Sequence, residues 1–163
     1  EETTAAWKMA MENIYTPTAL ILSRQDVTSV PNTSAEGVKK GAYIVSQDEN
    51  PQVVMLASGS EVSTLLAGAE LLRAEGIRLQ IVSVPSEAIF RQQSKEYQTA
   101  VLPQGVTRFG LTAGLPCNLE GLVGEHGTVW GLNSFGFSAP YKVLDEKLGF
   151  TAQNVYDQVK KLL

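Results

Sequence analysis

Apolar and polar positions follow two different periods between Gln52 and Pro85. Residues 53–57 form a continuous apolar run, as expected for a strand covered on both faces of a parallel sheet. Residues 79–84 form a second run of this kind. Between them, apolar side chains recur at three- and four-residue steps, the spacing of a helix with one buried face: Val62, Leu65, Leu66, Ala69 and Leu72. The stretch therefore predicts a strand, a helix and a parallel strand.

Two local signals predict the ends of this helix. Ser58 and Glu61 have the spacing of a capping box, in which the serine hydroxyl and the glutamate carboxylate bind each other's free backbone amides. Gly76 stands where a left-handed residue commonly ends a helix. We therefore expect the helix to begin next to Ser58 and to end before Gly76.

The rest of the chain alternates between predicted strands and helices. A first helix should bury Trp7, Ala10, Met11 and Ile14, with Thr3 or Thr4 as its cap. Further strands are predicted at residues 19–22, 43–46, 106–111 and 128–132, and further helices at 85–90, 94–102, 141–148 and after Thr151. Residues 113–123 predict a loop or an irregular helix. This alternation predicts an α/β fold, a three-layer α/β/α sandwich on a mostly parallel sheet.

A region without sustained periodicity separates the first predicted helix and strand from the rest. Residues 27–41 are rich in Ser, Thr, Asn and Pro and end in GVKKG, which predicts a linker. We place a domain boundary near Ala35, dividing the chain into residues 1–34 and 35–163. We expect the first part to be loosely attached, because strand 19–22 lacks neighbours. The absence of an initiator Met before Glu1 suggests a fragment of a longer protein.

Composition narrows the classes of protein and of partner. Hydrophobic residues make up 44% of the 163 residues and charged residues 18%, which is typical of a globular chain. Thirteen basic and seventeen acidic residues give a net charge of −4 without a basic stripe, which argues against nucleic acid and membrane partners. Cys117 is the single cysteine, so no internal disulfide can form and a cytoplasmic location is expected.

Few residues are candidates for chemistry. Ser58, Gly59 and Ser60 lie between a strand and a helix, where free amides can hold an anion, although such a turn is more often structural. Arg24 follows a predicted strand, and its planar guanidinium suits phosphate or carboxylate, although an arginine in such a place is more often solvated or salt-bridged. His126 and Cys117 have no recognisable partners. No set of residues predicts a catalytic centre or a metal site.

Three stretches together closely resemble the C-terminal part of transketolase. They are residues 17–25 (PTALILSRQ), 57–62 (ASGSEV) and 135–140 (FGFSAP). Residues 90–103 and 149–151 are similar to the same family. The resemblance covers the whole chain in order and spacing.

The resemblance implies a homodimeric enzyme that depends on thiamine diphosphate and Mg²⁺ or Ca²⁺. Such an enzyme transfers a two-carbon ketol unit between sugar phosphates. Residues 1–34 would be the tail of the pyrimidine-binding domain plus a linker, and residues 35–163 the C-terminal domain. The family's cofactor, metal and catalytic residues lie upstream of Glu1, so this chain alone should bind no cofactor and be inactive.

One functional residue is implied by the resemblance. Arg24 matches the arginine of the family's Leu-Ser-Arg-Gln motif, which contacts the substrate phosphate, whereas Asp26 replaces the usual asparagine. Two alternatives remain open at this point. One is a free-standing α/β ligand-binding or regulatory module, and the other is the C-terminal domain of a neighbouring thiamine diphosphate enzyme.

Overall fold

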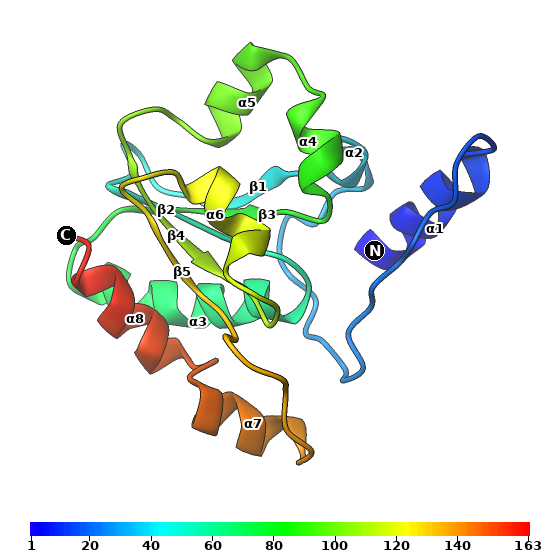
Figure 1. Cartoon of the computed structure of the whole chain (residues 1–163). Helices are drawn as coiled ribbons and strands as arrows, with labels where there is room; N and C mark the ends of the chain where they lie inside the picture. Colours follow the sequence, from blue (N-terminus) through cyan, green and yellow to red (C-terminus); the bar gives the residue numbers. More distant parts are fainter.

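One five-stranded sheet forms the centre of the computed structural model, which describes residues 1–163 (Figure 1). The strand order is β1-β3-β2-β4-β5. β2 is parallel to β3 and β4, and β4 is parallel to β5, whereas the edge strand β1 is antiparallel to β3. The mostly parallel sheet is therefore confirmed. The strands are β1 (Tyr43–Gln47), β2 (Val53–Ala57), β3 (Leu79–Ser83), β4 (Thr107–Leu111) and β5 (Thr128–Trp130).

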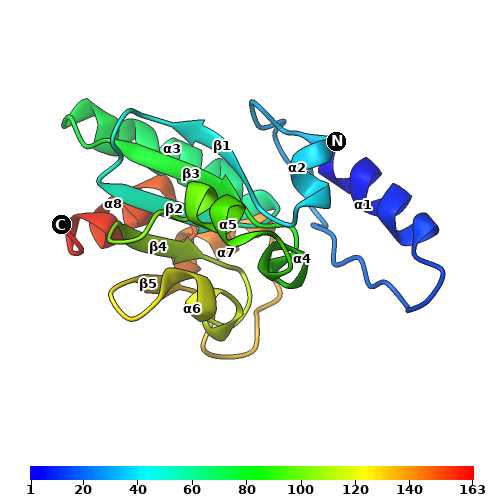
Figure 2. The same cartoon turned by 90° about the horizontal axis from the view of Figure 1, so that it is seen from above.

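Helices cover both faces of this sheet (Figure 2). Val53, Met55 and Ala57 of β2 share one core cluster with residues of the third and eighth helices, whereas Val54 and Leu56 share a second with residues of the fourth to sixth. The three-layer α/β/α architecture is confirmed. The helices are α1 (Glu2–Glu12), α2 (Ala35–Lys39), α3 (Ser60–Ala74), α4 (Glu87–Arg91), α5 (Lys95–Val101), α6 (Cys117–Val123), α7 (Tyr141–Leu148) and α8 (Ala152–Lys160).

The start of α3 differs from the prediction. Gly59 is the N-cap, with φ 61° and ψ −130°, and no side chain caps the helix. The helix begins at Ser60, so Glu61 is its second residue and stands one position too early to complete a capping box with Ser58. The other end is as predicted, because Gly76 has φ 78° and donates its amide proton to the Arg73 carbonyl.

Residues 1–41 contain further departures from the prediction. No hydroxyl caps α1, and Trp7, Met11 and Ile14 are 55%, 76% and 78% exposed, so the predicted apolar face does not face the core. Residues 19–22 form no strand, because no other strand lies beside them to complete the hydrogen bonds. Within the predicted linker, Ser34 caps the short helix α2.

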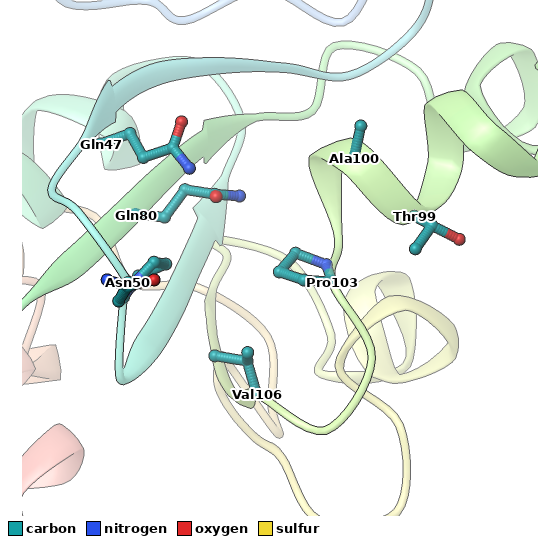
Figure 3. Close-up of a pocket in the computed structure, with 8 residues that line it drawn as sticks. Gln47, Asn50, Gln80, Thr99, Ala100, Pro103 and Val106 are labelled. Carbon is teal, nitrogen blue, oxygen red and sulfur yellow. The ribbon is translucent and has the colours of Figure 1, made fainter.

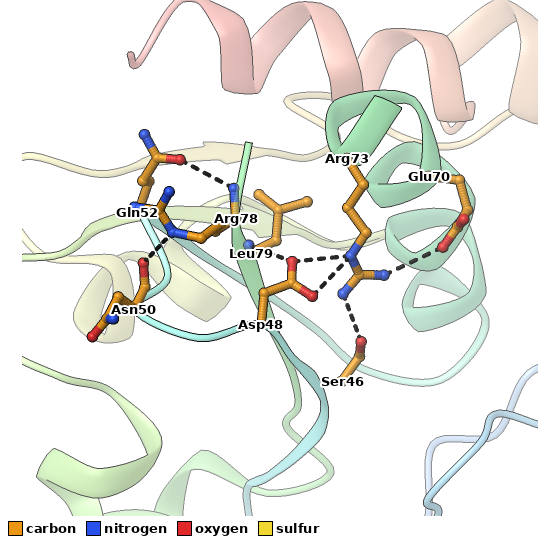
Figure 4. A network of polar contacts seen from close by, with 8 residues as sticks. All are labelled: Ser46, Asp48, Asn50, Gln52, Glu70, Arg73, Arg78 and Leu79. Carbon is orange, nitrogen blue, oxygen red and sulfur yellow. Dashed lines mark hydrogen bonds and ion pairs between the residues drawn. The ribbon is translucent and has the colours of Figure 1, made fainter. Parts of the chain in front are cut away.

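A polar network joins three elements at the edge of the sheet where the parallel strands begin (Figure 4). The Arg73 guanidinium of α3 donates to both carboxylate oxygens of Asp48, at 3.0 and 3.2 Å, and to Ser46 Oγ at 2.8 Å. The Leu79 amide of β3 donates to the same carboxylate at 2.8 Å. Asp48 therefore ties the end of β1 to α3 and β3.

Candidate functional site

The turn Ser58-Gly59-Ser60 lies where β2 ends and α3 begins, at the carboxyl edge of the parallel strands. Ligands of open α/β sheets bind at this edge. Ser58 and Gly59 are exposed, and no side chain caps the first amides of α3. The turn therefore has the geometry of an anion-binding helix start.

Ser23, the residue before Arg24, lies close to this turn. A Cβ atom added at Gly59 would lie 3.2 Å from Ser23 Oγ, a close approach that adds to the strain of a positive φ. Arg24 follows directly, is exposed, and forms no ion pair within the chain. The fold thus brings together two stretches that the sequence marks separately, and Ser23 is a contact that sequence reasoning missed.

Glu61 is a carboxyl group at the same helix start whose environment the sequence does not reveal. Its side chain accepts a hydrogen bond from Ser60 Oγ at 2.8 Å. Burial raises the pKa of Glu61, and the nearby Asp145 carboxylate raises it further, against the effect of hydrogen bonds from Ser60 and from backbone amides. Next to the Ser58–Ser60 turn, an ionised Glu61 would oppose a bound anion, and a protonated Glu61 would not.

A second polar cluster lies at the carboxyl end of β3. Tyr43 Oη and Ser83 Oγ donate hydrogen bonds to the same oxygen, Oε1 of Glu2, at 2.7 and 2.6 Å. Burial and the neighbouring Glu2 carboxylate raise the pKa of Tyr43, which keeps its phenol protonated as a donor. No local sequence signal marks these residues, because the contacts join positions 41 and 81 residues apart.

The opposite edge of the sheet has a hollow of about 480 Å³, shown in Figure 3. Its lining is uncharged and includes Gln47, Asn50, Gln80 and Thr99. The Gln80 side chain is fully buried and donates from Nε2 to the Val101 carbonyl at 2.5 Å. This amide therefore joins β3 to α5, and the hollow offers no acid, base or nucleophile.

The remaining candidate residues lie apart from one another. His126 is exposed in the turn between α6 and β5, and Cys117 is exposed at the start of α6. No group of three His, Cys, Asp or Glu side chains could hold a metal ion. None of the helices is both long enough and apolar enough to cross a membrane.

An aromatic loop joins β5 to α7. Phe135 and Phe137 are 97% and 65% exposed, and Tyr141 at the start of α7 is 45% exposed. This side of the molecule therefore presents large apolar side chains to solvent.

Comparison with known proteins gives consistent results. The sequence matches the family described as transketolase-like TK C-terminal domain over residues 41–151. The transketolases of Geobacillus stearothermophilus and Staphylococcus aureus (strain MW2) are 43% and 42% identical to it, over 99% of this chain. Each alignment covers 25% of the relative, so the chain spans about a quarter of the length of these curated proteins.

Solved structures show the same similarity. Transketolase from Leishmania mexicana superposes with a TM-score of 0.92 at 39% identity, covering 99% of this chain and 23% of that one. The transketolase complex with sedoheptulose-7-phosphate from Pichia stipitis gives a TM-score of 0.90 at 32% identity, over 99% and 24% of the two chains. Because the family match spans more than half of its residues, this chain belongs to the transketolase-like C-terminal domain family.

Proposed function

We propose that this chain is the C-terminal part of a transketolase, an enzyme that transfers a two-carbon ketol unit between sugar phosphates. Family membership and 41–43% identity to curated transketolases support this assignment. A related structure contains sedoheptulose-7-phosphate, which supports a sugar phosphate as substrate. In this enzyme, residues 1–34 form the end of the pyrimidine-binding domain plus a linker, and residues 35–163 form the C-terminal domain.

Such an enzyme uses thiamine diphosphate with a divalent metal, and this chain spans only about a quarter of the length of its curated relatives. Within this chain, no group of three His, Cys, Asp or Glu side chains could hold a metal ion. We therefore assign thiamine diphosphate and Mg²⁺ or Ca²⁺ to the part of the enzyme outside this chain. The 35–163 domain serves as scaffold and, through exposed apolar side chains such as Phe135 and Phe137, contacts other domains or the second subunit of a cytoplasmic homodimer.

Arg24 is the residue of this chain that we propose to contact substrate. The observation that supports this role is its position: an exposed guanidinium without an ion pair, directly after Ser23, which lies against the turn at the carboxyl edge. A guanidinium can bind a phosphate through two parallel hydrogen bonds. Arg24 would therefore hold the terminal phosphate of the sugar.

Substitution of Arg24 in the complete enzyme tests this role. Charge-assisted hydrogen bonds contribute roughly 1.5–3 kcal/mol, so Arg24→Ala should raise KM for phosphorylated donors by about 10- to 150-fold. Arg24→Lys should restore part of the loss, because an ammonium group cannot form the two-pronged contact. Transfer from hydroxypyruvate, which has no phosphate, should change little.

The matched control is Arg78→Ala. Arg78 is also exposed but donates to the Asn50 carbonyl at the opposite edge of the sheet. Its removal should leave KM for both donor types unchanged. Equal losses for phosphorylated and unphosphorylated donors in Arg24→Ala would show that Arg24 only supports the local structure.

A further inference from the structure

Helix α1 lies beside α2, and its N-terminal end points toward the rest of the domain (Figures 1 and 2). Glu2, Ala5 and Met9 follow the three- and four-residue spacing of a helix face. Ala5 is 8% exposed within the main core cluster, and Met9 packs partly buried against the same cluster. Trp7 and Met11 face solvent, so the apolar contact of α1 is small and its polar contact gains importance.

The polar contact consists of two buried hydroxyl groups that bind one carboxylate. Tyr43 and Ser83 are 5% and 1% exposed and lie opposite each other in the β1–β3 pair. Both hydroxyls donate to Glu2 Oε1. A buried hydroxyl that loses its acceptor is costly, so removal of Glu2 would take away the charged acceptor that both hydroxyls share.

The ring of Tyr43 is held in place from the other side by α2. A Cβ atom added at Gly37 would lie 2.4 Å from Tyr43 Cγ, so only glycine allows α2 to cover the ring this closely. The Tyr43 hydroxyl is thereby aimed at Glu2, with little freedom to turn away.

We propose that Glu2, Tyr43 and Ser83 form a latch that fixes α1 to the carboxyl edge of the sheet, so that α1 and residues 35–163 move as one body. Residues 13–29 then form a segment whose two ends are held at fixed places on the domain. One end is latched α1, and the other is Asn32, whose Nδ2 donates to the Val45 carbonyl of β1 at 3.0 Å. If Arg24 binds phosphate as proposed above, the latch sets where its segment begins.

Hydrogen exchange of the 163-residue chain tests the latch without any assay of activity. Glu2→Ala should speed exchange of the α1 amides by about 10-fold or more, because two hydrogen bonds to a charged group are lost. Tyr43→Phe, which keeps the ring under α2, should produce a smaller increase. The double variant should exchange no faster than Glu2→Ala, because both changes remove the same contact.

A distance measurement gives a second readout. Cys117 is exposed on α6, and Lys8 on α1 has a side chain that is 66% exposed. Spin labels on Cys117 and on Lys8→Cys therefore report the distance between α1 and the rest of the domain. The latched chain should give one narrow distance distribution, and Glu2→Ala should broaden it. A distribution that stays narrow in Glu2→Ala, with unchanged exchange of α1, would overturn the proposal.

The control is another glutamate of the same helix. Glu12 is 61% exposed and pairs only with Lys8, at 3.9 Å. Glu12→Ala should leave both exchange and the distance distribution unchanged, because exposed ion pairs of this kind contribute little. Equal effects of Glu2→Ala and Glu12→Ala would mean that helix charge, and not the latch, holds α1.

Discussion

The Asp48 carboxylate, directly after β1, binds groups of two other elements, Arg73 of α3 and the Leu79 amide of β3. Burial alone would raise the pKa of Asp48, but hydrogen bonds from Arg73 and from the Leu79 amide hold it below its usual value. A carboxyl group with a lowered folded-state pKa stabilises the protein above its unfolded-state pKa. That stabilisation is lost as the pH falls through the folded-state pKa. Asp48 therefore stabilises the folded protein near neutral pH but not in strong acid.

Asp48→Asn should therefore have a pH-dependent effect. At pH 7 the free energy of unfolding should fall by about 1.5–3 kcal/mol, because the bonds from Arg73 lose their charge. The difference from the unchanged protein should shrink as the pH falls below about 4, where Asp48 takes up a proton in the unfolded chain, and should vanish below the lower folded-state pKa. Urea unfolding at pH 7 and at pH 3 measures both values.

Glu70→Gln is the control for this prediction. Glu70 binds the same guanidinium at 3.2 Å, but its side chain is 75% exposed. Its removal should change the free energy of unfolding by less than about 1 kcal/mol. If Glu70→Gln lowered the free energy of unfolding as much as Asp48→Asn, the stabilisation would come from any partner of Arg73 and not from Asp48 in particular.

At the scale of elements, α3 and α8 approach closely at a glycine. A Cβ atom at Gly68 of α3 would lie 2.5 Å from Val155 Cγ1 and 3.2 Å from the Ala152 carbonyl oxygen of α8. Gly68 and Val155 are both buried. The glycine thus sets the distance between two helices that cover one face of the sheet.

Gly68→Ala should destabilise the protein although alanine favours a helix. Alanine gains about 1 kcal/mol of helix propensity, whereas overpacking costs about 1–3 kcal/mol, so we expect a net loss of up to about 2 kcal/mol in chemical denaturation. Val155→Ala in the same chain should relieve the clash, so the double variant should lose less than the sum of the single losses. Additive losses would show that the two helices do not meet at these residues.

The elements predicted from sequence are those whose signals are local. The β2–α3–β3 unit appears as expected because each part is a continuous run or a regular stripe. Residues 19–22 have an equally apolar run, but a strand also needs neighbours, and the chain supplies none. Helix α2 is five residues long, too short to show a period, and was predicted as linker.

The candidate site was predictable only in part. Arg24 and Ser58–Ser60 each stand out in the sequence, by motif and by position between elements. Tertiary contacts across long stretches of chain bring these two stretches together, through Ser23 and Gly59. Contacts of the same kind place Glu2 against Tyr43 and Ser83. The positive φ of Gly59 also displaced the start of α3, which no spacing rule anticipates.

At the scale of the whole molecule, the sheet and both core clusters lie almost entirely within residues 38–159. The 163-residue chain should therefore fold cooperatively on its own. It should show no ketol transfer and no stoichiometric binding of thiamine diphosphate with Mg²⁺, because we assign the cofactor to the part of the enzyme outside this chain. Calorimetric titration beside the complete enzyme measures this, and micromolar one-to-one binding by the chain would contradict it.

The contact between Asn32 and β1 has a consequence for self-association. An edge strand offers unpaired amides and carbonyls on which another chain can add a strand. In β1 the register shifts between Ile44 and Ser46, and the Val45 carbonyl between them already accepts a hydrogen bond from Asn32. A second copy approaching this edge meets an interrupted row of hydrogen-bonding groups, so β1 is protected against the edge-to-edge pairing from which aggregates grow.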